Sequence, residues 1–429
     1  MLGYRSKIKC TTSKLKPHEG FIMSKLLRTI LAASAALGAL AISTPSQAMS
    51  TYARQTGQAC SSCHFQHYPL LNEFGRAFKA GGYTMGGKQG LIDGAGLSLP
   101  DVLNAGIVTK IRYQKSNGPT VDGTHTTNNG ELQFPDELLL ELGGRISENI
   151  GFQADLSLKN GGGDVVDGMK IPFIYDVAGF KAGVVPFTTA GQGSAYGFEL
   201  LNTGAARGQR MVEARKTFSA QQYVGMGGTA AEGFAFVGSN SQFFANLSKW
   251  SPRSVGDSSG SPSATYFRVA ATPTYGDWDL GVGLQSWSGH ATNAGGASVN
   301  TKAFALDGQA QGKVGAMPLG VYLSYAKADA TNGGTPNLFN SNPNAKKSAN
   351  IAAELGVLPG KATVTLAYRN GDNGKAAHNG DNSWMIGGSY QIVQNVQLQL
   401  NHEMFSGSAY DGTPANGDQL TTLMLFASF

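Results

Sequence analysis

The feature that most constrains the fold is an alternation of apolar and polar residues, which returns in about sixteen segments between residue 101 and the C-terminus. In residues 151–159, for example, every second side chain from Phe152 to Leu158 is apolar and those between are polar. This period places successive side chains on opposite faces of a β-strand. The segments are roughly 101–115, 132–146, 151–160, 168–176, 179–187, 231–238, 241–250, 263–274, 278–290, 301–314, 317–328, 348–358, 361–370, 383–392, 395–406 and 418–429.

The connections between these segments alternate between short and long. Residues 177–178 and 315–316 are examples of the short set, and residues 188–230 are the longest of the other set. Short periplasmic turns that alternate with long extracellular loops are typical of outer-membrane barrels, and an even strand number puts both termini in the periplasm. A soluble sandwich, the alternative, would have Greek-key connections. We therefore predict a mainly β fold, a transmembrane antiparallel barrel of about sixteen strands whose apolar face contacts lipid.

The ends and the two faces of the strands carry further signals. The chain ends in the aromatic residue Phe429, which resembles the C-terminal signal of outer-membrane barrels. Candidates for aromatic girdles at the membrane surfaces are Tyr113, Trp250, Trp278, Trp287, Trp384 and Phe429, of which Trp287 has inward parity. Charges of inward parity are Arg112, Glu141, Arg145, Asp155, Arg268, Glu354, Arg369 and Glu403. We interpret these charges as a solvated or paired lumen wall, with ion conduction or attachment of the N-terminal segment as the weaker interpretation.

The N-terminus indicates export. A basic stretch at residues 23–28 precedes an apolar stretch at 29–42, and residues 46–48 match a small-x-small cleavage pattern, so we predict a signal peptide cleaved after Ala48. Residues 1–22 are then an upstream extension, and Met23 is the expected start. Seven of the 33 basic residues but one of the 28 acidic residues lie in 1–48, so the predicted mature chain is nearly neutral. Its charge gives no reason to expect a nucleic-acid partner.

The predicted mature chain keeps two cysteines, both in the stretch Cys60-Ser61-Ser62-Cys63-His64. This is the C-x-x-C-H pattern of c-type haem attachment. The two thiols can reach the two vinyl positions of one haem, and His64 follows at the position of the proximal iron ligand. A zinc site would need two further ligands at metal spacing, and a thioredoxin-like pair would need a βαβ context. A structural disulfide would not require the adjacent histidine.

The other axial position is less determined. Met85 follows His64 at a distance that lets the chain pass over a haem, and a thioether ligand would raise the reduction potential. A histidine elsewhere or an open position are the alternatives, while His67 is too close to His64 to reach the opposite haem face. Residues 68–79 have helical apolar spacing, so we predict a short helix that starts near Pro69 and ends near Gly81 and Gly82, with Phe74 and Phe78 packed on the haem.

Three parts are thus expected: 1–48 (extension and signal peptide), 49–96 (monohaem cytochrome c segment) and 97–429 (porin-like barrel). This order resembles the fused monohaem cytochrome c–porin family of outer-membrane iron(II) oxidases. The resemblance covers the whole predicted mature chain and rests on residues 59–64 and 69–79, with 134–137 and 143–149, in combination with the barrel.

The resemblance implies an iron(II):cytochrome c oxidoreductase. Extracellular Fe(II) would give its electron to one haem c, and a periplasmic cytochrome or other electron carrier would receive it. Because the hydrocarbon core is about 30 Å thick, we expect the haem segment to plug the lumen rather than to hang below the barrel. The alternatives are a conduit with a different donor or outward electron flow, and a diffusion porin with a structural haem.

An iron site cannot be chosen from the sequence. The long loops carry the hard or borderline ligands Asp122, His125, His290, Asp372, His378 and Asp381, which suit iron. Loops are polar for solvation alone, so no residue among them is singled out. There is also no P-loop and no nucleophile elbow, which argues against a nucleotide enzyme or a hydrolase.

Overall fold

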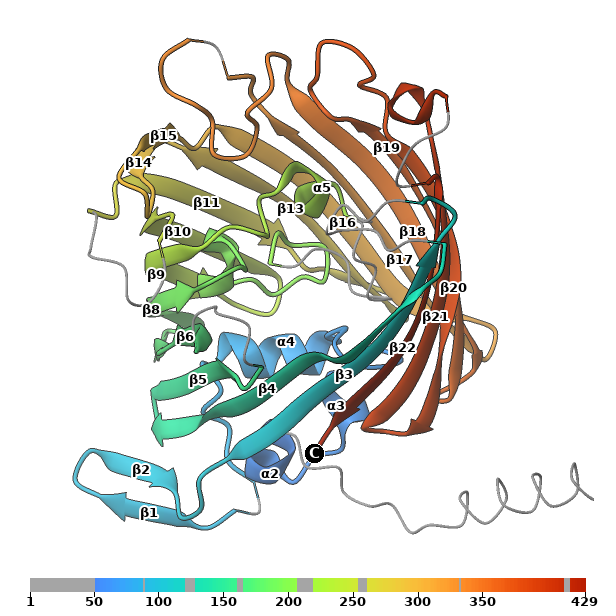
Figure 1. Ribbon diagram of the computed structural model, residues 1–429. Coiled ribbons are helices and arrows are strands. Elements are labelled where there is room, and N and C mark those ends of the chain that lie inside the picture. The colour runs from blue at the N-terminus through green and yellow to red at the C-terminus, as the bar shows by residue number, and fades with distance from the viewer. Residues whose placement is uncertain are drawn as a thin grey trace, which may run out of the picture. The chain divides into compact units, whose positions relative to one another are not determined.

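The computed structural model describes residues 51–87, 89–119, 128–159, 165–206, 219–253, 261–331, 333–412 and 417–429. The predicted signal peptide and Met23 lie outside the described residues. Within them, the strands close into one antiparallel barrel, in which the last strand pairs with the first barrel strand from Leu420–Ser116 to Ser428–Val108 (Figure 1). Closure leaves no unpaired sheet edge.

The barrel has sixteen strand positions within the described residues. Two of these positions are each filled by two shorter strands in succession. β6 and β7 share the position between β5 and β8, and both pair with these two neighbours. β11 and β12 share the position beside β13, and both pair with it. The strands are β3 (Ala105–Ser116), β4 (Glu131–Ser147), β5 (Ile150–Ser157), β6 (Val166–Lys170), β7 (Phe173–Val177), β8 (Phe180–Thr189), β9 (Ala231–Ser239), β10 (Phe243–Ser251), β11 (Ala264–Ala271), β12 (Thr274–Tyr275), β13 (Trp278–Ser288), β16 (Ala303–Val314), β17 (Met317–Ala328), β18 (Lys346–Leu358), β19 (Ala362–Asp372), β20 (Asn382–Val393), β21 (Val396–Ser406) and β22 (Gln419–Ser428). Each of the sixteen predicted segments contains one strand position, so the predicted barrel is confirmed.

The strands are apolar outside and polar inside. On β21, Leu398 and Leu400 are 37% and 53% exposed, whereas Gln399 and Asn401 are 3% and 1% exposed. Water-soluble proteins show the opposite arrangement, because burying polar groups rather than apolar ones costs free energy. An outward apolar band around a polar interior is characteristic of barrels that face lipid.

The predicted alternation of connections is also observed. Short turns join the strands at one end of the barrel, and several contain a glycine with positive φ, such as Gly315 at 61° between β16 and β17. Left-handed residues suit such tight hairpins because their twist matches that of the strands. The long connections lie at the opposite end, where one of them carries the hairpin β14 (His290–Thr292) and β15 (Ser298–Asn300) and another carries the 3-10 helix η2 (Ser408–Tyr410).

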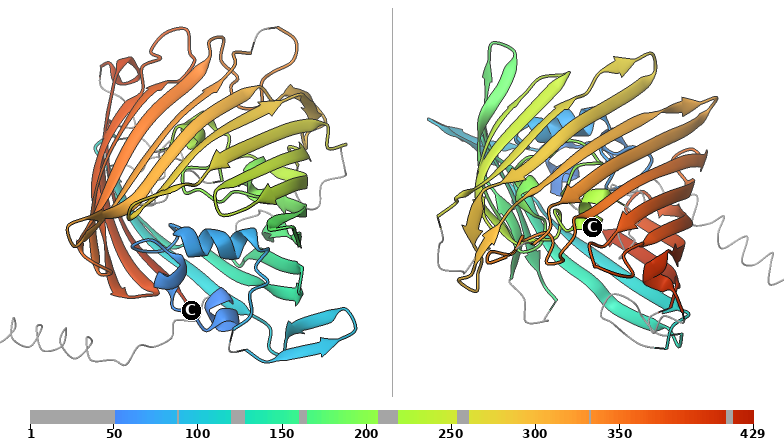
Figure 2. Two further views of the ribbon diagram at one scale, coloured as in Figure 1. Left: turned by 180° about the vertical axis from the view of Figure 1, so that it is seen from behind. Right: turned by 90° about the horizontal axis from the view of Figure 1, so that it is seen from above.

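The longest connection, between β8 and β9, does not stay outside the barrel. Its 3-10 helix η1 (Ser194–Gly197) and its helix α5 (Ala220–Val224) lie within the ring of strands (Figures 1 and 2). Both are fully buried or nearly so, and α5 packs on β17 and β18. The sequence predicted a plain extracellular loop here, and this prediction was incomplete. We call described residues 190–206 and 219–230 the infolded loop.

The N-terminal segment contains α2 (Thr51–Thr56), α3 (Cys60–Cys63) and α4 (Glu73–Ala80), followed by the hairpin β1 (Leu91–Gly94) and β2 (Leu97–Pro100). The hairpin was not anticipated. The predicted start of α4 near Pro69 was wrong: Asn72 is the N-cap, and its side chain accepts a hydrogen bond from the amide of Gly75. An asparagine cap satisfies an otherwise unbonded helix amide, so the helix begins where this cap stands.

Among the described residues, no helix is long and apolar enough to cross a membrane.

The aromatic residues divide between the two faces. Tyr113, Trp384 and Phe429 are 41%, 47% and 55% exposed, which suits a girdle, and Trp287 is buried as its parity predicted. Trp250 is fully buried, so it lines the interior and does not belong to a girdle. The polar parity of Trp250, which is shared with Asn246 and Ser248 on β10, explains this position.

Candidate functional site

The C-x-x-C-H motif forms a compact structure. Cys60 and Cys63 are the first and last residues of the single-turn helix α3, and both are free thiols. Burial raises the pKa of each thiol, with the neighbouring Cys60 adding to the effect on Cys63. The pair is therefore poised as two neutral thiols that point from one helical turn.

His64 is held by the backbone that follows it. Its Nδ1 lies 3.1 Å from the carbonyl oxygen of Leu70, and its own amide donates to the carbonyl of Cys60. The chain folds back so that His64 and Leu71 form an isolated antiparallel bridge. Metal-binding histidines commonly use one ring nitrogen for such a carbonyl, which sets the ring orientation and directs the other nitrogen to the metal. Nε2 is thus the atom of His64 that can coordinate iron.

Helix α4 packs directly on the motif. A Cβ atom at Gly75 would overlap the carbonyl oxygen of Cys63, so the close approach of α4 to α3 needs glycine at this position. The amide of Asn72 donates to the same Cys63 carbonyl, at 3.0 Å, and its side chain donates to the carbonyl of Ser62. Packing and hydrogen bonds therefore fix the motif from its C-terminal side.

The motif opens into a cavity of about 250 Å³ inside the barrel. That volume is many times the space that one water molecule needs. Cys60, Cys63 and His64 line it together with residues of the barrel wall and of the infolded loop. The described residues that line the cavity beside the motif include Tyr68, Phe78, Lys79, Tyr83, Val108, Lys110, Glu137, Leu139, Asp155, Lys170, Gln192, Tyr196, Ala206 and Phe426.

One part of the cavity wall is apolar. Val108, Leu139 and Phe426 belong to one buried cluster of strands β3, β4 and β22, against which Tyr68 packs. The Tyr68 ring stacks on Phe426 with centroids 5.0 Å apart and meets the His64 ring edge-on at 5.2 Å. An apolar surface therefore begins beside His64, as a flat aromatic ligand would require.

The two phenylalanines of α4 have different positions. Phe78 is buried and lines the cavity, so its packing on a haem stays a prediction, whereas Phe74 is 39% exposed and does not line the cavity, so the same prediction for Phe74 was wrong. The buried face of α4 contains Gly75 and Arg76 instead. The prediction from helical periodicity took the apolar face of the helix to be the buried one. The lumen wall that α4 contacts is partly polar, so a face with Arg76 is buried instead.

Two ion pairs attach the segment to one side of the barrel wall, at β13 and at β18, which β16 and β17 separate. Arg76 of α4 forms a bidentate pair with Asp279 of β13, with N–O distances of 2.6 and 2.7 Å. His67 Nε2 lies 2.7 Å from a carboxylate oxygen of Glu354 on β18, and both side chains are fully buried. Charged hydrogen bonds of this kind fix orientation as well as position. The N-terminal segment thus lies inside the lumen near the short turns, as the plug prediction required.

The infolded loop also reaches the motif. The side chain of Asn202 accepts from the amide of Leu71 at 2.8 Å and donates to the carbonyl of Leu71 at 2.9 Å. The amide of Asn202 in turn donates to Gln309 on β16. No sequence signal distinguished Asn202, because asparagine in a long loop is unremarkable until the contacts are known.

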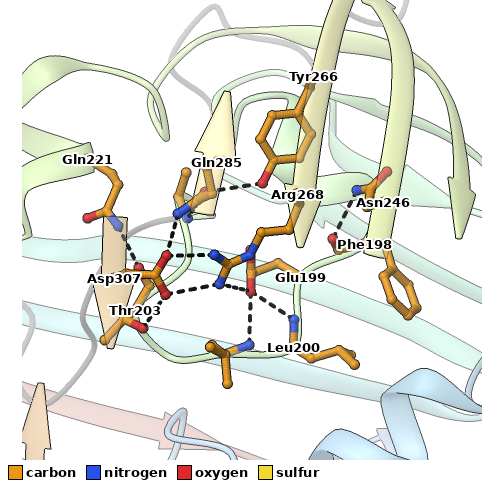
Figure 3. Close-up of polar contacts among 12 residues, drawn as sticks. Phe198, Glu199, Leu200, Thr203, Gln221, Asn246, Tyr266, Arg268, Gln285 and Asp307 are labelled. Carbon is orange, nitrogen blue, oxygen red and sulfur yellow. Dashed lines mark hydrogen bonds and ion pairs between the residues drawn. The ribbon is translucent and has the colours of Figure 1, made fainter. Parts of the chain in front are cut away.

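A buried charge network holds this part of the infolded loop. Figure 3 shows the guanidinium of Arg268 between the carboxylates of Glu199 and Asp307. Arg268 Nη1 lies 2.6 Å from Asp307, and Nη2 donates to Glu199 at 3.1 Å. Thr203 adds a hydrogen bond to Asp307 of 2.7 Å. Of these charged residues, only Arg268 was predicted to line the lumen. Asp307 on β16 and the loop residue Glu199 were not anticipated.

Met85 lies elsewhere. Its side chain is 41% exposed, and it is absent from the described residues that line the cavity. Its carbonyl accepts a hydrogen bond from Gln55. The structure therefore brings together three of the four predicted site residues and does not bring Met85 to them.

The residues present fit a c-type haem. They provide two neutral thiols on one turn, a histidine with Nδ1 bonded to a carbonyl, and an adjacent cavity with an apolar wall. In the described part of the chain, no group of three or more His, Cys, Asp or Glu side chains is arranged to hold a metal ion. The further ligands that a zinc site at Cys60 and Cys63 would need are therefore not found among these residues.

Each described loop ligand suggested for iron bonds a neighbouring protein group. His290 bonds Asn300, His378 bonds the carbonyl of Ser408, and Asp381 pairs with Arg369 at 2.7 Å. Asp372 accepts from the amide of Gly374. Asp122 and His125 lie outside the described residues.

Comparison with known proteins gives structural likenesses at low identity. OmpT of Vibrio cholerae is 10% identical, with a TM-score of 0.44, over 79% of this chain and 100% of that one. A porin refined at 1.8 Å resolution is 13% identical, with a TM-score of 0.45, over 76% and 100%. A Rh. blastica porin mutant is 15% identical, with a TM-score of 0.46, over 76% and 100%. No protein-family model and no curated protein matches the sequence.

Proposed function

We propose that this chain is an outer-membrane cytochrome–porin that oxidises extracellular Fe(II) and passes the electron through one haem c to a periplasmic electron carrier. The observation that carries the proposal is the motif itself, with free Cys60 and Cys63 beside His64, whose Nδ1 bonds a backbone carbonyl, at a cavity inside a closed barrel. Few chemistries other than covalent haem attachment need two thiols and an adjacent histidine at a cavity inside a barrel. In this reading the chain is an iron(II):cytochrome c oxidoreductase.

The outer membrane suits the barrel surface. Outward side chains such as Leu366, Ile386 and Leu400 are each 53% exposed, and exposed apolar surface of this extent calls for lipid. We assign the short-turn end to the periplasm, because short periplasmic turns are the rule in such barrels. The N-terminal segment, which lies near the short turns, then stands where a periplasmic carrier can approach it.

The haem, when bound, would supply one-electron exchange between two partners that never meet. The chain's own residues do the remaining work. Cys60 and Cys63 would hold the group covalently, and His64 would ligate it through Nε2. Tyr68 and Phe426 would cover its face and limit water, which is one of the ways in which a protein sets a haem potential.

The cavity borders on a loop that comes from the long-loop end of the barrel. The infolded loop enters the lumen from the long-loop end, and its residues Gln192, Tyr196 and Ala206 line the same cavity as His64. Fe(II) that enters the lumen would lose one electron and remain as Fe(III) on the outer side, while a periplasmic carrier gains that electron. The choice of Fe(II) as donor rests on the family resemblance stated above.

The test is an anaerobic visible spectrum of the detergent-purified, full-length protein before and after addition of Fe(II). The proposal expects a reduced c-type α-band after Fe(II), and no covalent haem in the double variant Cys60→Ser, Cys63→Ser. Reduction by dithionite but not by Fe(II) would keep the cytochrome–porin and exclude the iron substrate. Solute flux through liposomes together with a haem that no donor reduces would favour a diffusion porin with a structural haem.

A further inference from the structure

The buried pair of His67 and Glu354 has a proton arrangement that attachment of the segment does not require. His67 Nε2 lies 2.7 Å from Glu354 Oε1, and its Nδ1 lies 2.7 Å from the carbonyl oxygen of Tyr68. Both side chains of the pair are fully buried. A carbonyl oxygen and an ionised carboxylate only accept hydrogen bonds. The imidazolium form of His67 satisfies both contacts, whereas a neutral ring beside an ionised Glu354 satisfies one.

Glu354 is the charged group that faces His67 most closely. Its second carboxylate oxygen lies 3.4 Å from the side-chain amide of Gln66. Its cross-strand neighbours are Gly320 on β17 and Thr365 on β19, neither of which carries a charge. The proton on His67 is therefore governed mainly by one carboxylate.

Two further titratable groups stand on this side of the barrel wall. Tyr322 of β17 is fully buried, and its hydroxyl accepts a hydrogen bond from Gln311. Asp279 of β13 is paired with Arg76 of α4 at 2.6 Å. Because Asp279 has its own counter-charge and a phenol is neutral near pH 7, neither group competes with Glu354 for the charge of His67.

The turn that carries His67 also carries the predicted iron ligand. His64 Nδ1 lies 3.1 Å from the carbonyl oxygen of Leu70, and the amide of Leu70 donates to the carbonyl of His67 at 3.2 Å. Tyr68 touches both histidines, because its carbonyl faces His67 Nδ1 and its ring meets the His64 ring edge-on. Three residues of chain span at most about 11 Å, so His67 stays within that reach of His64.

A charge on His67 therefore acts on a charge held at His64. At an effective dielectric constant of about 20, two unit charges about 11 Å apart shift each other's equilibria by roughly tenfold. An electron gained at the haem removes one unit of positive charge and so strengthens proton binding by His67. By linkage, a proton on His67 strengthens electron uptake by the same factor.

We propose that the pair of His67 and Glu354 takes up a proton when the haem gains an electron and releases it when the electron leaves. The electron comes from the donor, and the proton comes from water and binds the imidazole of His67. Electron transfer to the periplasmic carrier returns the proton to water. The inference rests on the proposed function for its cofactor and does not depend on the identity of the donor.

The direction of the pH dependence follows from the pair. Burial lowers the pKa of His67, but the charge and hydrogen bond of Glu354 and the carbonyl of Tyr68 raise it by more, to above the ordinary 6.5. We therefore expect a fall of the midpoint potential as the pH rises above 6.5, where the reduced protein keeps its proton longer than the oxidised protein. A tenfold coupling corresponds to a total fall of about 59 mV. On either side of this range the potential should be level.

The experiment is a redox titration of the α-band in full-length, haem-loaded protein with mediators, from about pH 5 to about pH 9. His67→Gln should keep the covalent α-band and lose the pH-dependent fall. Glu354→Gln should keep the fall but move it below pH 6.5, because burial then acts on His67 without a counter-charge. If His67 only attached the segment, its replacement would change the potential equally at every pH.

His402→Gln is the matched control. His402 also stands beside a buried carboxylate residue in the sequence, but it has the outward parity of β21, and its Nδ1 lies 2.9 Å from Thr421. This variant loses the same titratable group from another part of the barrel. It should show the fall at the same pH as the unmodified protein.

A fall of unchanged size and position in His67→Gln and Glu354→Gln would overturn the inference. The proton would then bind the haem propionates or the carboxylates that line the cavity, which are Glu137, Glu141, Asp155 and Asp167. A level potential in the unmodified protein would overturn it as well. If His67→Gln does not retain haem, the position of the fall in Glu354→Gln decides.

These outcomes are separate from failure of the proposed function. The titration uses mediators and dithionite, so a haem that Fe(II) does not reduce removes the iron substrate and leaves the proton coupling in place. A protein without covalent haem would contradict both proposals. A haem that Fe(II) reduces, at a potential that does not change with pH, would contradict the proton coupling alone.

Discussion

Asn202 holds the backbone of Leu71 on both sides, accepting from its amide and donating to its carbonyl at 2.8 and 2.9 Å. Leu71 follows Leu70, whose carbonyl receives the amide of Phe65 and contacts Nδ1 of His64. The infolded loop, which begins at the long-loop end of the barrel, therefore holds the stretch of backbone that orients His64, the predicted haem ligand.

The first prediction concerns this clamp. In Asn202→Ala the amide of Leu71 loses its acceptor, at a cost of roughly 1.4 kcal/mol, which corresponds to about tenfold faster hydrogen exchange at that amide. Exchange followed by mass spectrometry on a peptide covering residues 65–75 measures it. Asn246→Ala, which removes a hydrogen bond to the carbonyl of Phe198 on the same loop, is the control and should leave this peptide unchanged. Equal exchange in both variants would show that the clamp does not protect Leu71.

The second prediction concerns His67 and Glu354. Burial lowers the pKa of His67, but the charge and hydrogen bond of Glu354 and the carbonyl of Tyr68 raise it by more, so its pKa stands above the ordinary 6.5. Because the folded state then binds the proton more tightly, the protonated pair stabilises the fold fully below pH 6.5. That contribution is lost as the pH rises through the raised pKa.

Thermal unfolding in detergent across this pH range tests the pair. The unmodified protein should lose stability as the pH rises from 6.5, whereas Glu354→Gln should lose it as the pH falls, because burial then acts on His67 without a counter-charge. Glu137→Gln, which affects Lys110 instead, is the control and should keep the original slope. A Glu354→Gln profile parallel to that of the unmodified protein would contradict the prediction.

The third prediction uses the pair between Arg76 and Asp279 in a double-mutant cycle. Arg76→Met leaves a largely buried carboxylate without its guanidinium, and Asp279→Leu leaves the opposite charge. The double variant should therefore be more stable than the sum of the single effects implies, with an interaction energy of roughly 1–3 kcal/mol. Urea unfolding in lipid vesicles measures all four proteins. Additive effects would mean that the pair does not attach α4 to the wall.

The fourth prediction concerns Arg268. Its replacement by Met leaves Glu199 and Asp307 buried together, so we expect a loss of about 3–5 kcal/mol and release of the infolded loop. Limited proteolysis of the folded barrel should then cut near Glu199, a position that is protected in the unmodified protein. The triple variant Arg268→Met, Glu199→Gln and Asp307→Asn removes the unpaired charges and should recover part of the protection. If the single and triple variants are cut alike, charge pairing is not what holds the loop.

The sequence alone determined the strands and the attachment motif. Each strand is recognised from its own residues, because a period of two is a local property, and closure follows from the number of strands and from the alternating lengths of their connections. Cys60, Cys63 and His64 were likewise found from spacing, since the covalent chemistry itself fixes the spacing of these residues.

The tertiary structure alone decided what fills the barrel. The inward course of the loop after β8 and the clamp by Asn202 join residues far apart in the chain. The same holds for α4, which buries Arg76 rather than Phe74 because its partner is the carboxylate of Asp279 on β13. Local periodicity carries no information about such partners. They depend on which polar side chains the closed barrel presents to its lumen, and this is settled only when the strands have paired.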